Sequence, residues 1–177
     1  METSQIAPEL RFGVELSARE VLEVALWLER CGSEFFRFLS ESQERDSLRR
    51  FYLRLMGMEM EHENRVRHLL QSAPAEKADK RAFDETLTDR EFLSKLKKAM
   101  EEHIFPVDLN FITEMEQFTT AEDAVPLALK IKEQSHRMYN WLSRFQLSPE
   151  AAQVIQSLIA EEAEHLREIR QIYRRAG

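Results

Sequence analysis

The sequence contains two Glu-x-x-His motifs, Glu59/His62 and Glu162/His165. Residues three apart lie on one face of a helix, so in each motif the carboxylate and the imidazole can point in the same direction. Carboxylate oxygen combined with imidazole nitrogen suits iron or manganese, and helical bundles hold such ligands on facing helices. One such motif is weak evidence, because three of the five histidines in this chain follow a Glu by three residues.

The two motifs belong to an internal repeat with a constant offset of 103 residues. The matched pairs include Ser17 with Thr120, Ala25 with Ala128, Phe36 with Tyr139, Glu59 with Glu162, and His62 with His165. Helix caps, apolar faces and both motifs share this offset without a gap, so we interpret the chain as a duplicated helix hairpin. The symmetry is expected to place both motifs at the same depth in the fold, which makes the pair strong evidence.

Apolar periodicity and cap signals predict four long helices, over about 17–38, 47–70, 120–145 and 148–173. The cap signals are Ser17 with Glu20, Asp46 before the second helix, Thr120 with Asp123, and Ser148 with Pro149. With only 4 Gly and 5 Pro in 177 residues, the chain has little material for turns. Helices of this length are therefore expected to make up most of an all-α fold.

The segment between the two hairpins, residues 71–119, is long enough to cross a helical bundle from end to end. It starts with a polar stretch, continues with a predicted short helix from Thr88 to about His103, and contains the helix breaker Pro106. We predict one domain over 1–177: a ferritin-like four-helix bundle made of hairpins 17–70 and 120–175 joined by this crossover.

A carboxylate-bridged pair of metal ions also needs one Glu from each of the other two helices. Glu29 lies within an apolar stretch of the first helix and is expected to face inward. Its counterpart in the repeat is Lys132, where a carboxylate is needed. Glu133 is turned by about 100° around the helix, whereas His136 lies one turn after Lys132 on nearly the same face. His136 is therefore a sixth candidate ligand beside Glu29 and the two motifs.

The lysine changes the charge of the predicted site. Three Glu and a protonated Lys132 sum to −2, which balances one divalent ion, and an uncompensated buried charge is costly. The ammonium group can also take the place of a missing metal, and a metal beside it would lower the pKa of Lys132. Three occupancies remain open: two metals with His136 recruited, one metal, or none.

Charge and hydropathy exclude several functional classes. The net charge of −7 argues against a general nucleic-acid binder, because phosphate binding needs a concentrated Lys/Arg surface. No apolar run approaches the roughly 18 residues of a membrane span. The N-terminal METSQIAPELRFG lacks the basic and apolar segments of a signal peptide. We therefore expect a cytoplasmic protein that binds neither nucleic acid nor membranes.

The chain resembles the rubrerythrin-like members of the ferritin-like, di-iron carboxylate superfamily. ALWLERCGSEFF and MEMEHENRV resemble the first half of these proteins, and LALKIKEQSHRMY and LIAEEAEHLREI resemble the second half. The resemblance covers nearly all of the chain except residues 71–119. Rubrerythrin proper adds an iron site held by four cysteines, but this chain contains only Cys31, so it resembles members without a rubredoxin domain. Lys132 departs from the family pattern, which has a carboxylate there.

The resemblance implies an iron-binding oxidoreductase that reduces peroxide or dioxygen or oxidises ferrous iron. It further implies one or two iron ions, with manganese or zinc as alternatives, a separate electron donor, and a homodimer. Glu29, Glu59 and Glu162 would supply oxygen ligands, and His62 and His165 nitrogen ligands. The alternative hypothesis is a degenerate structural or interaction bundle in which Lys132 pairs with the remaining ligands and redox activity is lost.

Overall fold

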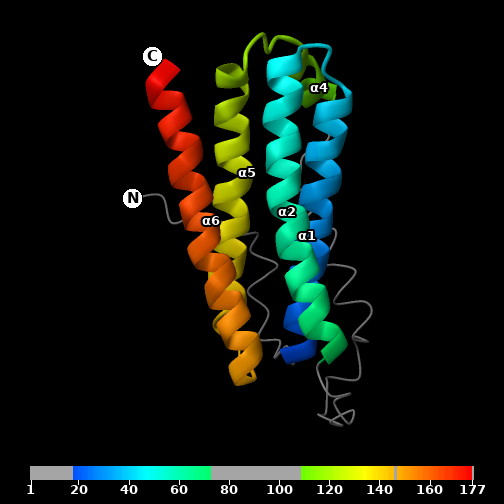
Figure 1. Cartoon of the computed structure of the whole chain (residues 1–177), viewed down its shortest axis with the longest axis vertical. Coiled ribbons are helices and arrows are strands. Elements are labelled where there is room, and N and C mark those ends of the chain that lie inside the picture. The colour runs from blue at the N-terminus through cyan, green and yellow to red at the C-terminus, as the bar shows by residue number, and fades with distance from the viewer. Residues whose placement is uncertain (1–17, 73–108, 146, 177) are drawn as a thin grey trace.

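The computed structural model describes residues 18–72, 109–145 and 147–176, and every regular element in these ranges is a helix. The helices are α1 (Ala18–Glu41), α2 (Asp46–Ser72), α4 (Leu109–Glu116), α5 (Ala121–Leu142) and α6 (Pro149–Ala176). Figure 1 shows the four long helices side by side, with α1 next to α2 and α5 next to α6. In that view α1 and α6 run upward and α2 and α5 run downward. Because α2 and α5 are parallel, the chain needs a long crossover between them.

The internal repeat is visible in where the helices begin. Ala121 at the start of α5 lies 103 residues after Ala18, and Pro149 at the start of α6 lies 103 residues after Asp46. Each of the nine buried residues of α5 also has a buried counterpart 103 residues earlier in α1. These pairs are Val21/Ala124, Leu22/Val125, Ala25/Ala128, Leu28/Ile131, Glu29/Lys132, Gly32/Ser135, Phe35/Met138, Phe36/Tyr139 and Leu39/Leu142. The inward positions of α5 thus repeat those of α1.

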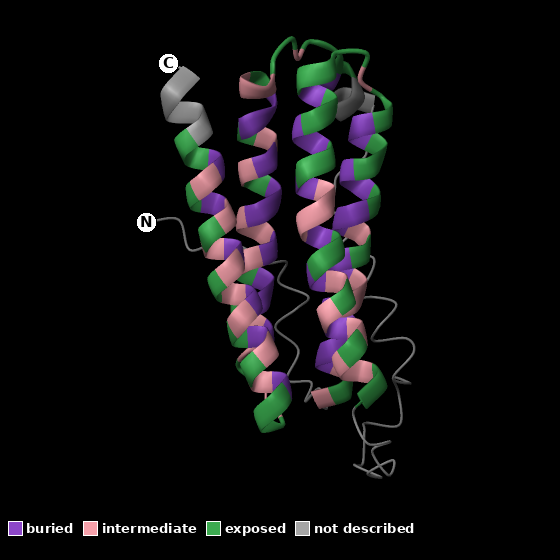
Figure 2. Ribbon diagram, viewed as in Figure 1, coloured by how far each residue is buried: buried purple, intermediate pink, exposed green. Residues whose placement is uncertain are grey.

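The core lies between the two hairpins. Figure 2 shows the buried residues of each long helix gathered on its inner side, with exposed residues on the outside. Phe36, Leu55, Leu158 and Tyr139 are among the fully buried side chains, and burying each side chain of this kind contributes about 1.5–3 kcal/mol. No helix within the described ranges is both long and apolar enough to cross a membrane. The buried inner face of each long helix therefore explains why the four helices pack together as a bundle.

The predicted caps of the second hairpin are confirmed. The Thr120 side chain accepts from the Asp123 backbone N–H, and the Asp123 carboxylate accepts from the Thr120 backbone N–H, which completes a capping box. The Ser148 hydroxyl accepts from the Ala151 N–H at 3.2 Å. Helix α2 begins at Asp46 itself, one residue earlier than predicted.

Two other predictions about helix positions concern residues outside the described ranges. Ser17, the first predicted cap, lies outside them, as does the predicted short helix from Thr88 to His103. Helix α4, Leu109–Glu116, begins shortly after the predicted helix breaker Pro106.

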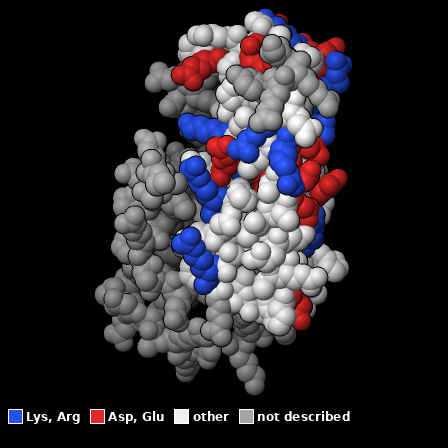
Figure 3. Space-filling view, turned by 90° about the vertical axis from the view of Figure 1, so that its left-hand side faces the viewer, with Lys and Arg blue, Asp and Glu red and all other residues white. Residues whose placement is uncertain are grey.

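Exposed ion pairs link neighbouring helices on the surface. Arg54 of α2 pairs with Glu168 of α6 at 2.8 Å, and Arg170 of α6 pairs with Glu133 of α5 at 2.7 Å. In Figure 3, basic and acidic side chains intermingle in the upper part of the described surface, whereas the lower part is mostly uncharged. Exposed pairs contribute only about 0–1 kcal/mol each, so the stability of the bundle rests mainly on its core.

Candidate metal centre

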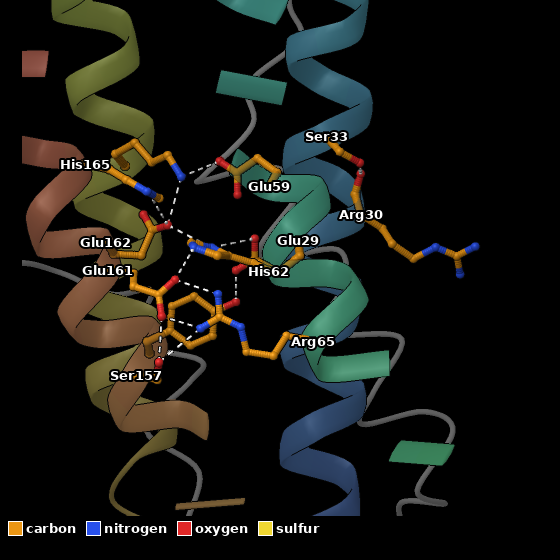
Figure 4. Close-up of polar contacts among 12 residues, drawn as sticks. Glu29, Arg30, Ser33, Glu59, His62, Arg65, Ser157, Glu161, Glu162 and His165 are labelled. Carbon is orange, nitrogen blue, oxygen red and sulfur yellow. Dashed lines mark hydrogen bonds and ion pairs between the residues drawn. The ribbon is translucent and has the colours of Figure 1, made fainter. Parts of the chain in front are cut away.

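The long helices bring ionisable side chains together inside the bundle. Each Glu-x-x-His motif lies within a long helix, so its carboxylate and imidazole project from one face. The carboxylates of the cluster are 0–3% exposed, and Figure 4 shows those of its side chains that are labelled converging between the two hairpins. The cluster comprises Glu29 from α1, Glu59 and His62 from α2, Lys132 from α5, and Glu162 and His165 from α6.

The donor atoms in the cluster are spaced closely enough to surround one cation. One donor atom from each of Glu29, Glu59, His62 and Glu162 lies within 4.8 Å of the others, and a second such group joins His62, Glu162 and His165. His62 Nδ1 is 3.4 Å from Glu29 Oε2 and 3.3 Å from Glu162 Oε1. The rings of His62 and His165 stack with their centroids 5.2 Å apart. The five ligands predicted from Glu29 and the two motifs are therefore brought together.

Lys132 places its ammonium group between the two motifs. Its Nζ donates a hydrogen bond to Glu162 Oε1 at 2.8 Å and lies 2.6 Å from Glu59 Oε1 as an ion pair. Burial lowers the pKa of Lys132, but the carboxylates of Glu162, Glu59 and Glu29 outweigh burial, so the pKa of Lys132 is raised. Lys132 therefore carries a positive charge at the position that is equivalent to Glu29 in the internal repeat.

Burial and neighbouring charges shift the pKa values of the other ionisable groups in the cluster in different directions. Burial raises the pKa of Glu59, and the carboxylates of Glu29 and Glu162 add to this rise, while Lys132 opposes it. Burial also acts to raise the pKa of Glu162, but Lys132, His165 and His62 hold it well below its usual range. Burial lowers the pKa of His62, yet its contacts with Glu162 and Glu29 raise it to about 10. Because a histidine nitrogen must be unprotonated to bind a metal, a cation would compete with a proton at His62.

Several buried polar atoms of the cluster have no hydrogen-bond partner within the described part of the chain. The atoms without a hydrogen bond in these ranges are Glu29 Oε2, His62 Nδ1, Glu162 Oε2 and His165 Nδ1, whereas Glu59 Oε1 has the Lys132 ammonium group beside it as an ion pair. A buried polar atom left without a partner costs about 1–3 kcal/mol, and a coordinated cation would remove that cost. The donor set therefore fits a divalent ion between Glu29, Glu59, His62 and Glu162. The part of the cluster with Lys132 and His165, both from the second hairpin, is a poor fit for a second divalent ion, because Lys132 already places a positive charge there.

His136 does not join the cluster. Its Nε2 lies 3.3 Å from Asn140 Nδ2, one turn further along α5, and it belongs to neither group of possible ligands in the described ranges. Glu133 faces Arg170 instead. Neither residue replaces the carboxylate that the repeat lacks at Lys132, because both side chains leave the inward stripe of α5.

Further residues support the cluster, and sequence reasoning missed the part played by most of them. The Tyr139 hydroxyl donates a hydrogen bond to Glu29 Oε1. Gly32 lies against Glu59: a Cβ atom at Gly32 would be 2.9 Å from Glu59 Cδ. A glycine within a long helix is the signal that could have revealed this close approach.

Sequence reasoning also missed a carboxylate that contacts His62, that of Glu161. Glu161 Oε2 lies 3.3 Å from His62 Nε2, and Glu161 is paired with Arg65. Hydrogen bonds from Arg65 and Ser157 lower the pKa of Glu161 to about 2 despite burial. Glu161 directly precedes the candidate ligand Glu162 in the sequence, and nothing in the sequence pattern separated it from the other surface acids of α6.

Comparison with known proteins supports the architecture. The chain matches no protein-family model and no curated protein. A crystal structure at 2.30 Å resolution, of a proposed ferritin-like diiron-carboxylate protein from Thermotoga maritima, matches with a TM-score of 0.56 and 21% sequence identity. The match covers 92% of this chain and 98% of that chain. The chain therefore has the ferritin-like helical bundle fold, as predicted, and a Glu/His cluster that could hold a metal ion lies inside it.

Proposed function

We propose that this protein binds iron at the buried cluster and acts as a rubrerythrin-like oxidoreductase. Its reaction would be the reduction of peroxide or dioxygen, or the oxidation of ferrous iron. The observation that carries the proposal is the group formed by Glu29, Glu59, His62 and Glu162, whose donor atoms lie within 4.8 Å of one another. Carboxylate and imidazole together suit iron, with manganese or zinc as alternatives. Bound iron would supply the one-electron chemistry.

The protein residues would hold the ion and keep it from bulk water. Glu59 and Glu162 come from opposite hairpins and both contact the Lys132 ammonium, so they can hold a cation between the two halves. His62 would bind through Nδ1, the nitrogen that faces the carboxylates. Each of these three ligands is at most 3% exposed. Because burial removes competing water, the electrostatic attraction between the carboxylates and a cation is strengthened.

The electron donor would be a separate molecule. The chain contains one cysteine, Cys31, and cannot form a four-cysteine iron site of its own. We further propose a small oxidant as the substrate and a homodimer as the working form, both from the rubrerythrin resemblance.

Iron loading tests the proposal directly. Protein purified without metal would be given ferrous iron under nitrogen, and iron per chain would be measured before and after exposure to oxygen or peroxide. We expect about one iron per chain, a visible absorption band that develops with the oxidant, and consumption of peroxide. His62→Ala should lose most of the iron while keeping its helical circular dichroism. Wild-type protein that stays free of iron, or equal iron in His62→Ala, would contradict the proposal.

A structural bundle without redox activity is the second candidate, and the ion pairs of Lys132 favour it. The ammonium group already neutralises part of the charge on Glu59 and Glu162. In that case added ferrous iron would not raise the melting temperature. If the protein binds iron, the melting temperature should rise with iron concentration, because a ligand that binds only the folded state stabilises it.

A further inference from the structure

The two histidines of the cluster differ in what lies behind them. Glu161 of α6 faces His62 Nε2 at 3.3 Å. The repeat pairs Glu161 with Met58 of α2, so the equivalent position in the other hairpin carries a thioether, which is only a weak hydrogen-bond acceptor. The site is therefore symmetric in its motifs but asymmetric in their support.

Glu161 is held in place from two sides. Arg65 of α2 reaches across to it with both guanidinium nitrogens, one of them 2.6 Å from Oε2. The Ser157 hydroxyl donates to Oε1 at 2.6 Å and accepts from Arg65 at 3.0 Å. Figure 4 shows these three side chains grouped beside His62, between α2 and α6. A two-pronged Arg–carboxylate contact fixes direction as well as distance, so Glu161 has little freedom to turn away.

The contact with Glu161 lies at Nε2 of His62, on the opposite side of the ring from the other carboxylates. Its Nδ1 faces Glu29 and Glu162, so Nε2 is the nitrogen that carries the ring proton when Nδ1 binds a cation. A carboxylate that accepts this proton fixes the ring and makes the other nitrogen a better ligand. In the other half, His165 Nδ1 lies 3.6 Å from Glu162 and has no hydrogen-bond partner in the described ranges.

We propose that Glu161, clamped by Arg65 and Ser157, is a positioning residue for His62 and directs a single divalent cation to the half formed by Glu29, Glu59, His62 and Glu162. Lys132, whose ammonium group contacts Glu59 and Glu162, supplies the second positive charge of the cluster in place of a second ion. This inference rests on the proposed function only in requiring that a metal binds, and it assigns the place of that metal whatever reaction follows.

Cobalt(II) is a suitable probe, because its visible spectrum reports ligand number and geometry. Affinity and spectrum would be measured anaerobically on the full chain. We expect one cobalt per chain in the wild type, a loss of at least about 100-fold in affinity for His62→Ala, and a loss below about 10-fold for His165→Ala. Glu161→Met, which copies the equivalent residue Met58, should weaken binding by about 10–100-fold and shift the spectrum.

Two further variants separate positioning from a simple loss of charge. Glu161→Gln keeps an acceptor for the His62 proton and should restore affinity to within about fivefold of the wild type, well above Glu161→Met. Glu164→Met removes an exposed carboxylate of the same helix, which pairs with Arg167, and should change neither affinity nor spectrum.

The results that would contradict the inference differ in which part of it they overturn. Equal losses in His62→Ala and His165→Ala would overturn the assignment of the metal to one half. Equal losses in Glu161→Gln and Glu161→Met would overturn the positioning role. In both cases metal binding itself would stand. A wild-type protein that binds no cobalt would overturn both this inference and the proposed function. Should Glu161→Met fail to fold, Arg65→Gln releases the clamp with Glu161 in place, and unchanged affinity there would contradict the inference.

Discussion

Lys132 and Glu29 occupy equivalent positions in the two hairpins, 103 residues apart, and their oppositely charged side chains are buried in the same cluster. Lys132 pairs with Glu59 and Glu162, and Glu29 accepts a hydrogen bond from Tyr139. The charge difference between Lys132 and Glu29 therefore breaks the symmetry of the two repeated motifs. It also reduces the number of divalent ions that the buried charge can balance.

Restoring the carboxylate at Lys132 should raise the metal capacity. Lys132→Glu is expected to bind up to two divalent ions per chain, because the ligand charge changes from −2 to −4. Without metal, the same variant should lose about 3–5 kcal/mol of unfolding free energy, since it removes one partner of a buried ion pair. Metal per chain and urea unfolding with and without a chelator measure both effects. Lys130→Glu, on the exposed face of α5, is the matched control and should change neither.

The same measurement on His136 tests the remaining alternative. Because His136 contacts Asn140 outside the cluster, His136→Ala should leave metal per chain unchanged. Loss of one metal in His136→Ala, with no gain in Lys132→Glu, would mean that His136 moves into the site when metal binds.

Gly32 is expected to control the approach of Glu59 to the cluster. In Gly32→Ala the new Cβ atom would lie 2.9 Å from Glu59 Cδ, so the carboxylate must move and metal affinity should fall about tenfold or more. Gly57→Ala is the matched control, since a Cβ there meets nothing within 4 Å. It should gain about 0.5–1 kcal/mol of stability from helix propensity and leave affinity unchanged. Equal affinity in the two variants would show that Glu59 does not depend on this contact.

The two buried tyrosines should respond differently to removal of the hydroxyl. Tyr139→Phe leaves Glu29 Oε1 without its donor and should cost about 1–3 kcal/mol of unfolding free energy. The Tyr52 hydroxyl is buried without a hydrogen-bond partner in the described ranges, so Tyr52→Phe should be neutral or slightly stabilising. Chemical denaturation of both variants measures the difference. Similar losses would mean that the contact with Glu29 contributes nothing to stability.

Asp123 should make the stability of the protein depend on pH in acid. Hydrogen bonds from Thr119 and Thr120 lower the pKa of Asp123 from 3.8 to about 2. A pKa lowered on folding gives stability that is present above about 3.8 and is lost as the pH falls toward 2. The gap in unfolding free energy between wild type and Asp123→Asn should therefore shrink over that range. A constant gap would contradict this, and carboxyl NMR titration of Asp123 gives the pKa directly.

Much of the fold can be predicted from the sequence because its signals are local. The capping box at Thr120 and Asp123 depends on residues three apart, and the inward stripe of α5 follows from helical periodicity. The repeat adds a long-range restraint, since equal spacing in two hairpins predicts two motifs at equal depth. These features predicted four long helices and the two motifs that meet between them.

The tertiary structure decided how the charges in the site are arranged. Lys132 reaches Glu162 of α6 and Glu59 of α2, Glu161 turns toward His62 of α2, and His136 turns away. Each outcome depends on the rotamer of a long side chain and on the distance between helices that are far apart in the sequence. Helical spacing fixes which face a residue occupies, but the partner that a buried charge finds depends on the packing of the other helices, because burial makes any unpaired charge costly.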